Sequence, residues 1–162
     1  MMKRLAAALM SAALLVAGCA SYDGRDLVRG VATEGDVLGT MGKPAQTLQR
    51  PDGDKALYFS KLPYGRQMFV AAIGPDGRLK GIDQVLDSEH LQRIHIGTTT
   101  ADQVRAILGP PYQITRAPFK PLDVWEYPWR SAGQDRVLWV SLSDDGIVRE
   151  IFDTRPPSST KY

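Results

Sequence analysis

The sequence predicts an α+β fold made of two tandem units, each with two helices and three antiparallel strands, and with the helices on one face of the sheet. Three observations support this prediction: a gapless internal repeat, apolar residues at helical spacing at the start of each copy, and strand-like runs joined by Asp-Gly turns. The roughly 144 residues from position 19 onward suffice for one ordinary domain or two small ones that share a core.

The internal repeat aligns residues 30–44 with residues 97–111, an offset of 67 residues (97 minus 30). Thr33 and Thr100 occupy equivalent places, and each predicts a helix start because a threonine hydroxyl readily accepts a backbone N–H bond there. Gln103, three residues after Thr100, predicts a capping box.

Each predicted helix has an apolar stripe and a defined end. Gly42 and Gly109 stand where a left-handed residue ends a helix, and prolines follow both glycines. The stripe consists of Val37 and Met41 in the first copy and of Val104, Ile107 and Leu108 in the second.

Strand-like runs follow each helix. They cover residues 57–59, 69–73 and 79–85 in the first copy and residues 124–127, 137–142 and 147–152 in the second. Asp76-Gly77 and Asp145-Gly146 separate the last two runs of each copy, and this dipeptide predicts a hairpin because both residues tolerate positive φ.

One more helix is expected in each unit. Residues 87–94 carry a helix-start signal at Asp87 or Ser88 and lead into the second copy. The matching helix of the first unit is expected within residues 22–29.

The N-terminal segment has the layout of a secretory signal. Lys3 and Arg4 precede an apolar run of about a dozen residues, which is shorter than the roughly 20 that a membrane-spanning helix needs. Val16-Ala17-Gly18 then leads into Cys19, the single cysteine of the chain, as in a bacterial lipobox. We predict a cleaved signal over residues 1–18 and lipid on Cys19; the alternative is an ordinary signal peptide followed by a chance cysteine.

Charge excludes some partner classes. Removal of residues 1–18 takes away Lys3 and Arg4 and leaves 18 basic against 18 acidic side chains. This balance supports neither nucleic-acid binding nor a polybasic membrane patch. The predicted segments are a signal peptide (1–18), a lipidated tether (19–29), repeat 1 (30–85), repeat 2 (86–154) and a flexible tail (155–162).

Residues 86–111, followed by Trp125-Glu126-Tyr127 and the closing Asp-Gly hairpin, resemble the BamE (SmpA/OmlA) domain of outer-membrane lipoproteins. The first copy is similar more loosely, with Tyr58 in place of the tryptophan. The resemblance implies a lipid-anchored protein on the periplasmic face of the outer membrane, and Ala20 after Cys19 agrees with that sorting. It also implies an envelope protein partner, with the β-barrel assembly machinery as one candidate.

The residues give no support to catalysis. The chain lacks a Gly-x-Ser-x-Gly motif, a phosphate-binding glycine loop and a paired-cysteine zinc pattern. His90 and His95 are five residues apart and so lie on different faces of a helix, while Asp123 and Glu126 lie on opposite faces of a strand. We expect no catalytic residues, no metal and no cofactor.

Strand parity predicts a partner surface. Leu138, Val140 and Leu142 form an apolar face that should meet the helices as core, matched by Phe69, Ala71 and Ile73 in the first copy. Trp139 then points to the other face, where a large aromatic side chain is typical of a binding hot spot. We expect Trp139 to contact a protein partner, with Val137 and Val70 beside it; the alternative is that the tail or the other repeat covers Trp139.

Two functional hypotheses are consistent with these features. The first is a non-catalytic outer-membrane lipoprotein that binds a protein partner, as an accessory in outer-membrane protein assembly or envelope integrity. The second is an inhibitor-like module that blocks an envelope or foreign enzyme, because the tandem arrangement is similar to that of the β-lactamase inhibitor proteins, which bind a partner over a concave sheet.

Overall fold

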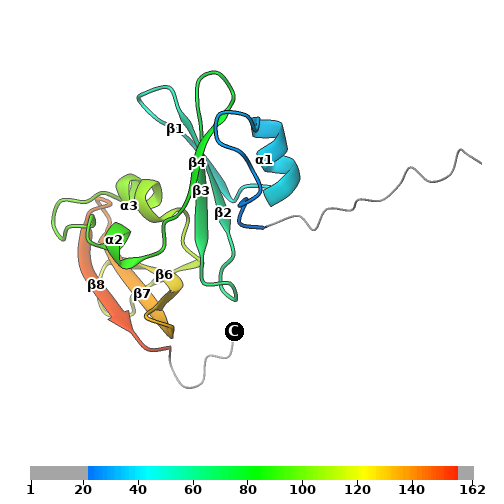
Figure 1. Ribbon diagram of the computed structural model, residues 1–162. Helices are drawn as coiled ribbons and strands as arrows, with labels where there is room; N and C mark the ends of the chain where they lie inside the picture. The colour runs from blue at the N-terminus through cyan, green and yellow to red at the C-terminus, as the bar shows by residue number, and fades with distance from the viewer. Residues whose placement is uncertain (1–21, 157–162) are drawn as a thin grey trace, which may run out of the picture.

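The computed structural model describes residues 22–156, in which eight strands form two antiparallel sheets and three short helices accompany them (Figure 1). The first unit comprises α1 (Glu34–Met41), β1 (Gln46–Gln49), β2 (Lys55–Ser60), β3 (Met68–Ile73) and β4 (Leu79–Gln84). The second unit comprises α2 (Ser88–Leu91), α3 (Ala101–Leu108), β5 (Gln113–Arg116), β6 (Leu122–Ser131), β7 (Gln134–Ser143) and β8 (Val148–Thr154). Sheet 1 has the order β1-β2-β3-β4 and sheet 2 the order β5-β6-β7-β8, which confirms the α+β class.

The starts of α1 and α3 confirm the predicted N-caps. The Thr33 hydroxyl accepts the Asp36 N–H at 3.2 Å, and the Thr33 N–H donates to the Asp36 carboxylate at 2.8 Å. Thr100 and Gln103 form the same capping box with the same two distances. Each helix therefore satisfies two of its free N-terminal N–H groups locally.

The ends of both helices have positive φ, at 85° for Gly42 and 80° for Gly109. Their ψ angles of −153° and −172° differ from the predicted left-handed helical conformation. This combination of angles is nearly restricted to glycine, so the requirement for glycine is stricter than predicted.

The Asp-Gly hairpins form as predicted, with φ of 76° at Gly77 and 75° at Gly146. The residue after each turn also pairs with the helix cap of its unit, as Thr33 with Arg78 and Thr100 with Ile147. One such β-bridge in each unit holds the start of the helix against the last hairpin of the unit's own sheet.

Each unit contains four strands where three were predicted. The missed strands, β1 and β5, have the sequences QTLQ and QITR and lie at the edges of their sheets. An edge strand needs backbone pairing on one side only and can remain polar, so it lacks the apolar alternation that identifies a strand.

The second unit has its predicted extra helix, whereas the first unit does not. Helix α2 begins after Asp87, whose carboxylate accepts the His90 N–H at 2.9 Å. Residues 22–29 form turns in place of the expected helix. Gly24 is buried with φ of 68°, and a Cβ there would lie 2.4 Å from Ile82 Cδ1, so this turn requires glycine.

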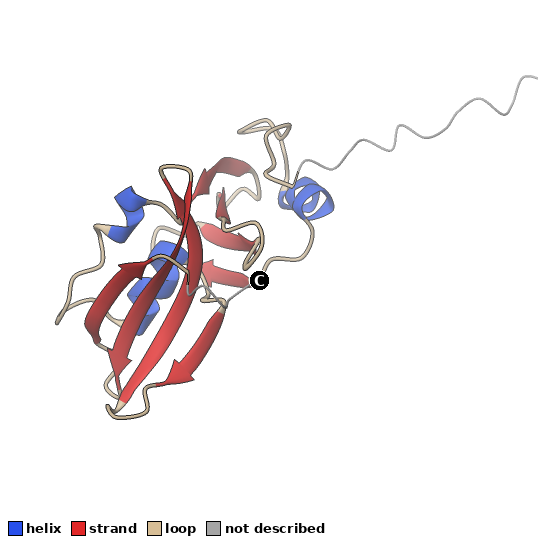
Figure 2. Cartoon of the chain, turned by 90° about the horizontal axis from the view of Figure 1, so that it is seen from below, coloured by secondary structure: helices blue, strands red, loops and turns tan. Residues whose placement is uncertain are grey.

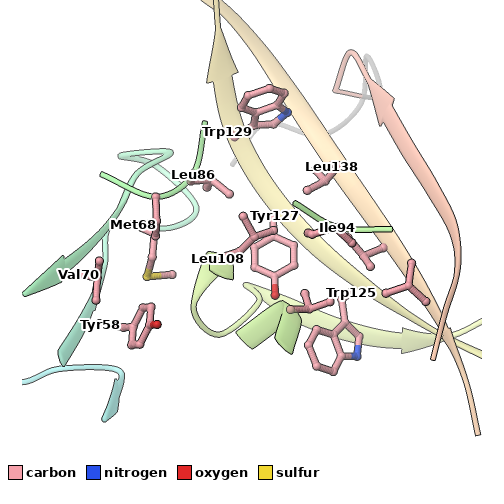
Figure 3. Packing of buried hydrophobic residues seen from close by; sticks show 14 of the residues in the cluster. Tyr58, Met68, Val70, Leu86, Ile94, Leu108, Trp125, Tyr127, Trp129 and Leu138 are labelled. Atoms are coloured by element: carbon pink, nitrogen blue, oxygen red, sulfur yellow. The ribbon is translucent and has the colours of Figure 1, made fainter. Parts of the chain in front are cut away.

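The two sheets do not join, and the helices do not all lie on one side. The molecule has four layers: α1 with the N-terminal segment, sheet 1, α2 with α3, and sheet 2 (Figure 1). One core lies between α1 and the near face of sheet 1 and includes Val37, Phe69, Ala71 and Ile73. The larger core lies between the sheets, where Tyr58, Met68 and Val70 of sheet 1 face Leu108, Tyr127 and Leu138 of the second unit (Figure 3).

The predicted signal peptide, Cys19 and most of the predicted tail lie outside the described residues. Within residues 22–156, no helix has the length and apolar character needed to cross a membrane.

Candidate functional site

Two rows of residues occupy equivalent positions in the two sheets. In sheet 1 the directly paired residues are Gln46, Tyr58, Val70 and Asp83, and in sheet 2 they are Gln113, Glu126, Trp139 and Phe152. Residues opposite each other in an antiparallel pair share a face. Each row lies on the face that points away from the unit's own long helix, because the neighbouring positions in each strand form the core with that helix.

In sheet 1, this face receives the end of helix α3. The Tyr58 hydroxyl donates to the Ala106 carbonyl at 2.6 Å, and Gln46 Nε2 donates to the Arg105 carbonyl at 3.5 Å. Val70 is 5% exposed and belongs to the core between the units. The row therefore satisfies carbonyl groups in the last turn of α3 and buries apolar surface against it.

In sheet 2, the equivalent face has no helix from the described residues, since α1 packs on sheet 1 and α2 and α3 lie between the sheets (Figure 2). Trp139 is half-buried, and its indole N–H donates to Thr154 Oγ1 at 3.2 Å. Phe152, its direct neighbour on β8, is 52% exposed. These two side chains are direct neighbours on adjacent strands, and both are at least partly open to solvent.

The other half of the row is polar. Glu126 is 2% exposed and accepts a hydrogen bond from Gln113 Nε2. A carboxylate thus stands where sheet 1 has the donating Tyr58 hydroxyl. The two faces consequently differ in hydrogen-bonding chemistry as well as in exposure.

A loop adds a third aromatic residue near this face. The loop joins β5 to β6, and an ion pair between Lys120 and Glu150 ties it to β8. Glu150 is two residues from Phe152 on the same strand and therefore shares its face. Phe119 in this loop is 96% exposed. We call Phe119, Trp139 and Phe152 the open aromatic face.

Strand parity predicted the core correctly, but two of the three predicted partner-binding residues are buried. Leu138, Val140 and Leu142 are buried between the sheets, and Trp139 points away from that core. Val137 shares the face of Trp139 but is fully buried, and Val70 lies in the core between the units. Val70 is inaccessible because the second unit stacks on sheet 1, and Val137 is fully buried although it lies on the outer face of sheet 2.

Phe119 and Phe152 were not predicted from the sequence. Phe152 could have been found, because it follows the alternation Glu150, Phe152, Thr154 on the face opposite Ile151. Phe119 lies outside every periodic segment, and only the ion pair of its neighbour Lys120 relates it to the sheet.

The titratable residues considered in the sequence make local contacts within residues 22–156. No three His, Cys, Asp or Glu side chains in this part of the chain are placed to hold a metal ion. His90 Nδ1 instead lies 2.8 Å from the Asp87 carboxylate that caps its own helix. Asp123 forms an ion pair with Arg116 at 2.9 Å on the opposite face from Glu126.

The second unit is similar in sequence to a known protein family. Residues 84–151 match the family described as the outer membrane protein assembly factor BamE domain. No curated protein matches the chain. A solved structure of a DUF4309 family protein (YjgB) from Bacillus subtilis is similar at 16% identity and a TM-score of 0.33, covering 82% of this chain and 84% of that one. The matched segment begins at the last residue of β4 and includes α2, α3 and all of sheet 2 up to Ile151, so the similarity to the BamE domain family covers the second unit.

Proposed function

We propose that the protein is a non-catalytic outer-membrane lipoprotein that assists outer-membrane protein assembly by binding an envelope protein partner. The observation that carries the proposal is the BamE domain, whose family description names outer-membrane protein assembly. Phe119 and Trp139 lie within the matched residues 84–151 and Phe152 follows them directly, which makes the open aromatic face our candidate for the partner contact. Subunits of the β-barrel assembly machinery are the expected class of partner.

The anchor in this proposal is lipid on Cys19 after removal of residues 1–18. The lipobox Val16-Ala17-Gly18 and the position of Cys19 support it. A single acyl chain binds membranes only marginally, so the several chains of a lipoprotein provide the stable attachment. Labelled palmitate should enter the wild type and not Cys19→Ala, and Ala20 leads us to expect the wild type in outer-membrane fractions.

The first unit, in this proposal, is a diverged copy of the same domain. Matching capping boxes, the two helix-to-hairpin bridges and the equivalent sheet rows support this. In the first unit the face equivalent to the open aromatic face binds a helix end. By analogy, we expect the open aromatic face to pack against a folded element of another protein.

Capture of partners by the native lipoprotein tests the function. Trp139→Ala should weaken capture by about 2 kcal/mol, roughly 30-fold, because truncation of a central aromatic anchor removes much of an interface's binding energy. Its melting temperature should change little, since the indole is half exposed. Tyr64→Ala is the matched control, because Tyr64 is 75% exposed but lies in the first unit, and it should capture normally.

The identity of the captured protein distinguishes the two functional hypotheses. Subunits of the barrel assembly machinery support the assembly role. A single soluble enzyme would contradict that role and favour an inhibitor. If Trp139→Ala captures the partner as well as the wild type does, the partner interface does not lie on the open aromatic face of sheet 2.

A further inference from the structure

Exposed apolar side chains gather on the outside of the α1 layer. Val28 is 62%, Val31 63% and Leu38 37% exposed. The Val31 N–H donates to the Val28 carbonyl at 3.2 Å, and both valines line a shallow groove with Gly35 and Gly39 of α1. Leu38 does not line this groove, but it is three residues from Gly35 and therefore neighbours it on the exposed surface of α1. We call Val28, Val31 and Leu38 the N-terminal patch.

The length of the chain before Tyr22 limits where a lipid anchor can be. Only Ala20 and Ser21 separate Cys19 from Tyr22, so Cys19 lies within about 11 Å of it. Tyr22 packs edge-to-face on Phe69, with ring centroids 6.3 Å apart, and Lys61 Nζ lies 5.1 Å from its ring. Because Phe69 belongs to the core beneath α1, the anchor attaches on the α1 side of sheet 1.

The N-terminal patch is flanked by charges of both signs. Arg25 is paired with Asp23, and Asp26 and Asp36 are exposed beside it. Attraction to anionic lipid is therefore weak, and contact with a membrane depends on apolar side chains. Large apolar side chains left in water beside a membrane anchor gain free energy when they enter the bilayer interface.

We propose that the N-terminal patch lies in the lipid surface as a second membrane contact and holds the α1 layer against the bilayer. This inference rests on the proposed lipidation of Cys19. The open aromatic face lies at the opposite end of the four layers, so this orientation points it away from the membrane and toward soluble or protruding partners (Figure 1).

Tryptophan quenching in vesicles tests the orientation. The full-length processed lipoprotein is reconstituted into phosphatidylethanolamine and phosphatidylglycerol vesicles, with and without bromine on the acyl chains. Variants carry Val31→Trp in the patch, Tyr22→Trp beside the anchor, or Phe152→Trp on the open aromatic face as the matched control. Wild type gives the background from Trp125 and Trp129, which are buried, and from Trp139, which is half-buried.

Brominated lipid should reduce the added emission of Val31→Trp at least about twofold and leave that of Phe152→Trp unchanged. Quenching of Tyr22→Trp alone would mean that the molecule stands on its anchor with the patch in water, and would overturn the inference. Equal quenching of Val31→Trp and Phe152→Trp would also overturn it. Failure of the wild type to float with vesicles would instead refute the lipidation on which the inference depends.

Discussion

The two sheets share one strand order and one register, yet their equivalent faces have different environments. Val70 in sheet 1 and Trp139 in sheet 2 occupy the same place in their rows. Val70 is covered by the second unit, whereas Trp139 remains partly open and sits beside the exposed Phe152. The difference arises from the order of the units, because the second unit docks on the first and the described residues contain no third unit to dock on the second.

Side-chain chemistry in the two rows agrees with this difference. The sheet 1 row offers Tyr58 and Gln46 as donors to helix carbonyls, as a fixed intramolecular contact requires. The sheet 2 row keeps its carboxylate, Glu126, bonded within the row and exposes aromatic rings. A face that binds and releases a partner must remain satisfied when free, and this arrangement meets that condition.

The largest expected effect comes from the glycines that end the two long helices. A Cβ at Gly109 would lie 2.9 Å from both Met68 Cγ and Tyr58 Cδ1 of the first unit, whereas a Cβ at Gly42 would meet nothing within 4 Å. Gly42→Ala should cost about 1–3 kcal/mol through its backbone angles alone. Gly109→Ala should cost about 1–3 kcal/mol more, because it also overpacks the contact between the units.

Urea unfolding of both variants measures this difference. Equal losses of stability for Gly42→Ala and Gly109→Ala would show that Gly109 is not tightly packed against the first unit. That result would contradict the difference in environment proposed for the two faces.

A smaller effect is expected for the hydrogen bond between the units. Tyr58→Phe leaves the Ala106 carbonyl without its donor and should cost about 1 kcal/mol. Burial raises the pKa of the Tyr58 hydroxyl, so it remains a donor at neutral pH. Because Tyr58 and Gly109 share a contact, Tyr58→Phe and Gly109→Ala should be non-additive by about 0.5 kcal/mol or more, whereas Tyr58→Phe and Gly42→Ala should add.

A double-mutant cycle in the same urea assay provides the measurement. Additivity of both pairs would mean that the Tyr58 hydrogen bond forms independently of the Gly109 contact.

Sequence patterns predicted what depends on neighbours along the chain. Thr33, Thr100, the two helix-ending glycines and the Asp-Gly hairpins all act within a few residues, and all were found in place. The same local patterns predicted the α+β class and the alternate residues of β3 and β7 that lie in the core. At the candidate site, the same alternation predicted that Trp139 points away from the core, as the structure shows.

Patterns failed where contacts between distant segments decide the structure. The stacking of sheet 1 on α3 depends on Tyr58, which bonds the Ala106 carbonyl 48 residues away, and on Val70, which shares a core with α3. Parity alone cannot state which face of a sheet a second unit will cover, so Val70 was assigned to the open surface. Gly24 likewise lies where Ile82 of β4 leaves no room for a side chain, a contact that the local sequence does not reveal.

The smallest expected effect concerns the two capping boxes, which differ in one residue. The box of α1 uses Asp36 and that of α3 uses Gln103. The pKa of Asp36 is lowered mainly because the Thr33 backbone N–H donates a hydrogen bond to its carboxylate. A second hydrogen bond, from the Thr33 hydroxyl, lowers the pKa further. A lowered pKa in the folded state contributes stability above the unfolded pKa of about 3.9, and this contribution is lost as the pH falls through the folded value. The first unit's cap should therefore weaken in acid, whereas Gln103 has no proton to gain.

The melting temperature of Asp36→Asn should fall less between pH 6 and pH 3 than that of the wild type, and Gln103→Asn should leave the wild-type fall unchanged. An equal fall in Asp36→Asn and wild type would mean that the acid sensitivity of the protein originates in its other carboxylates, because the Asn variant keeps the side-chain shape and removes only the titrating group.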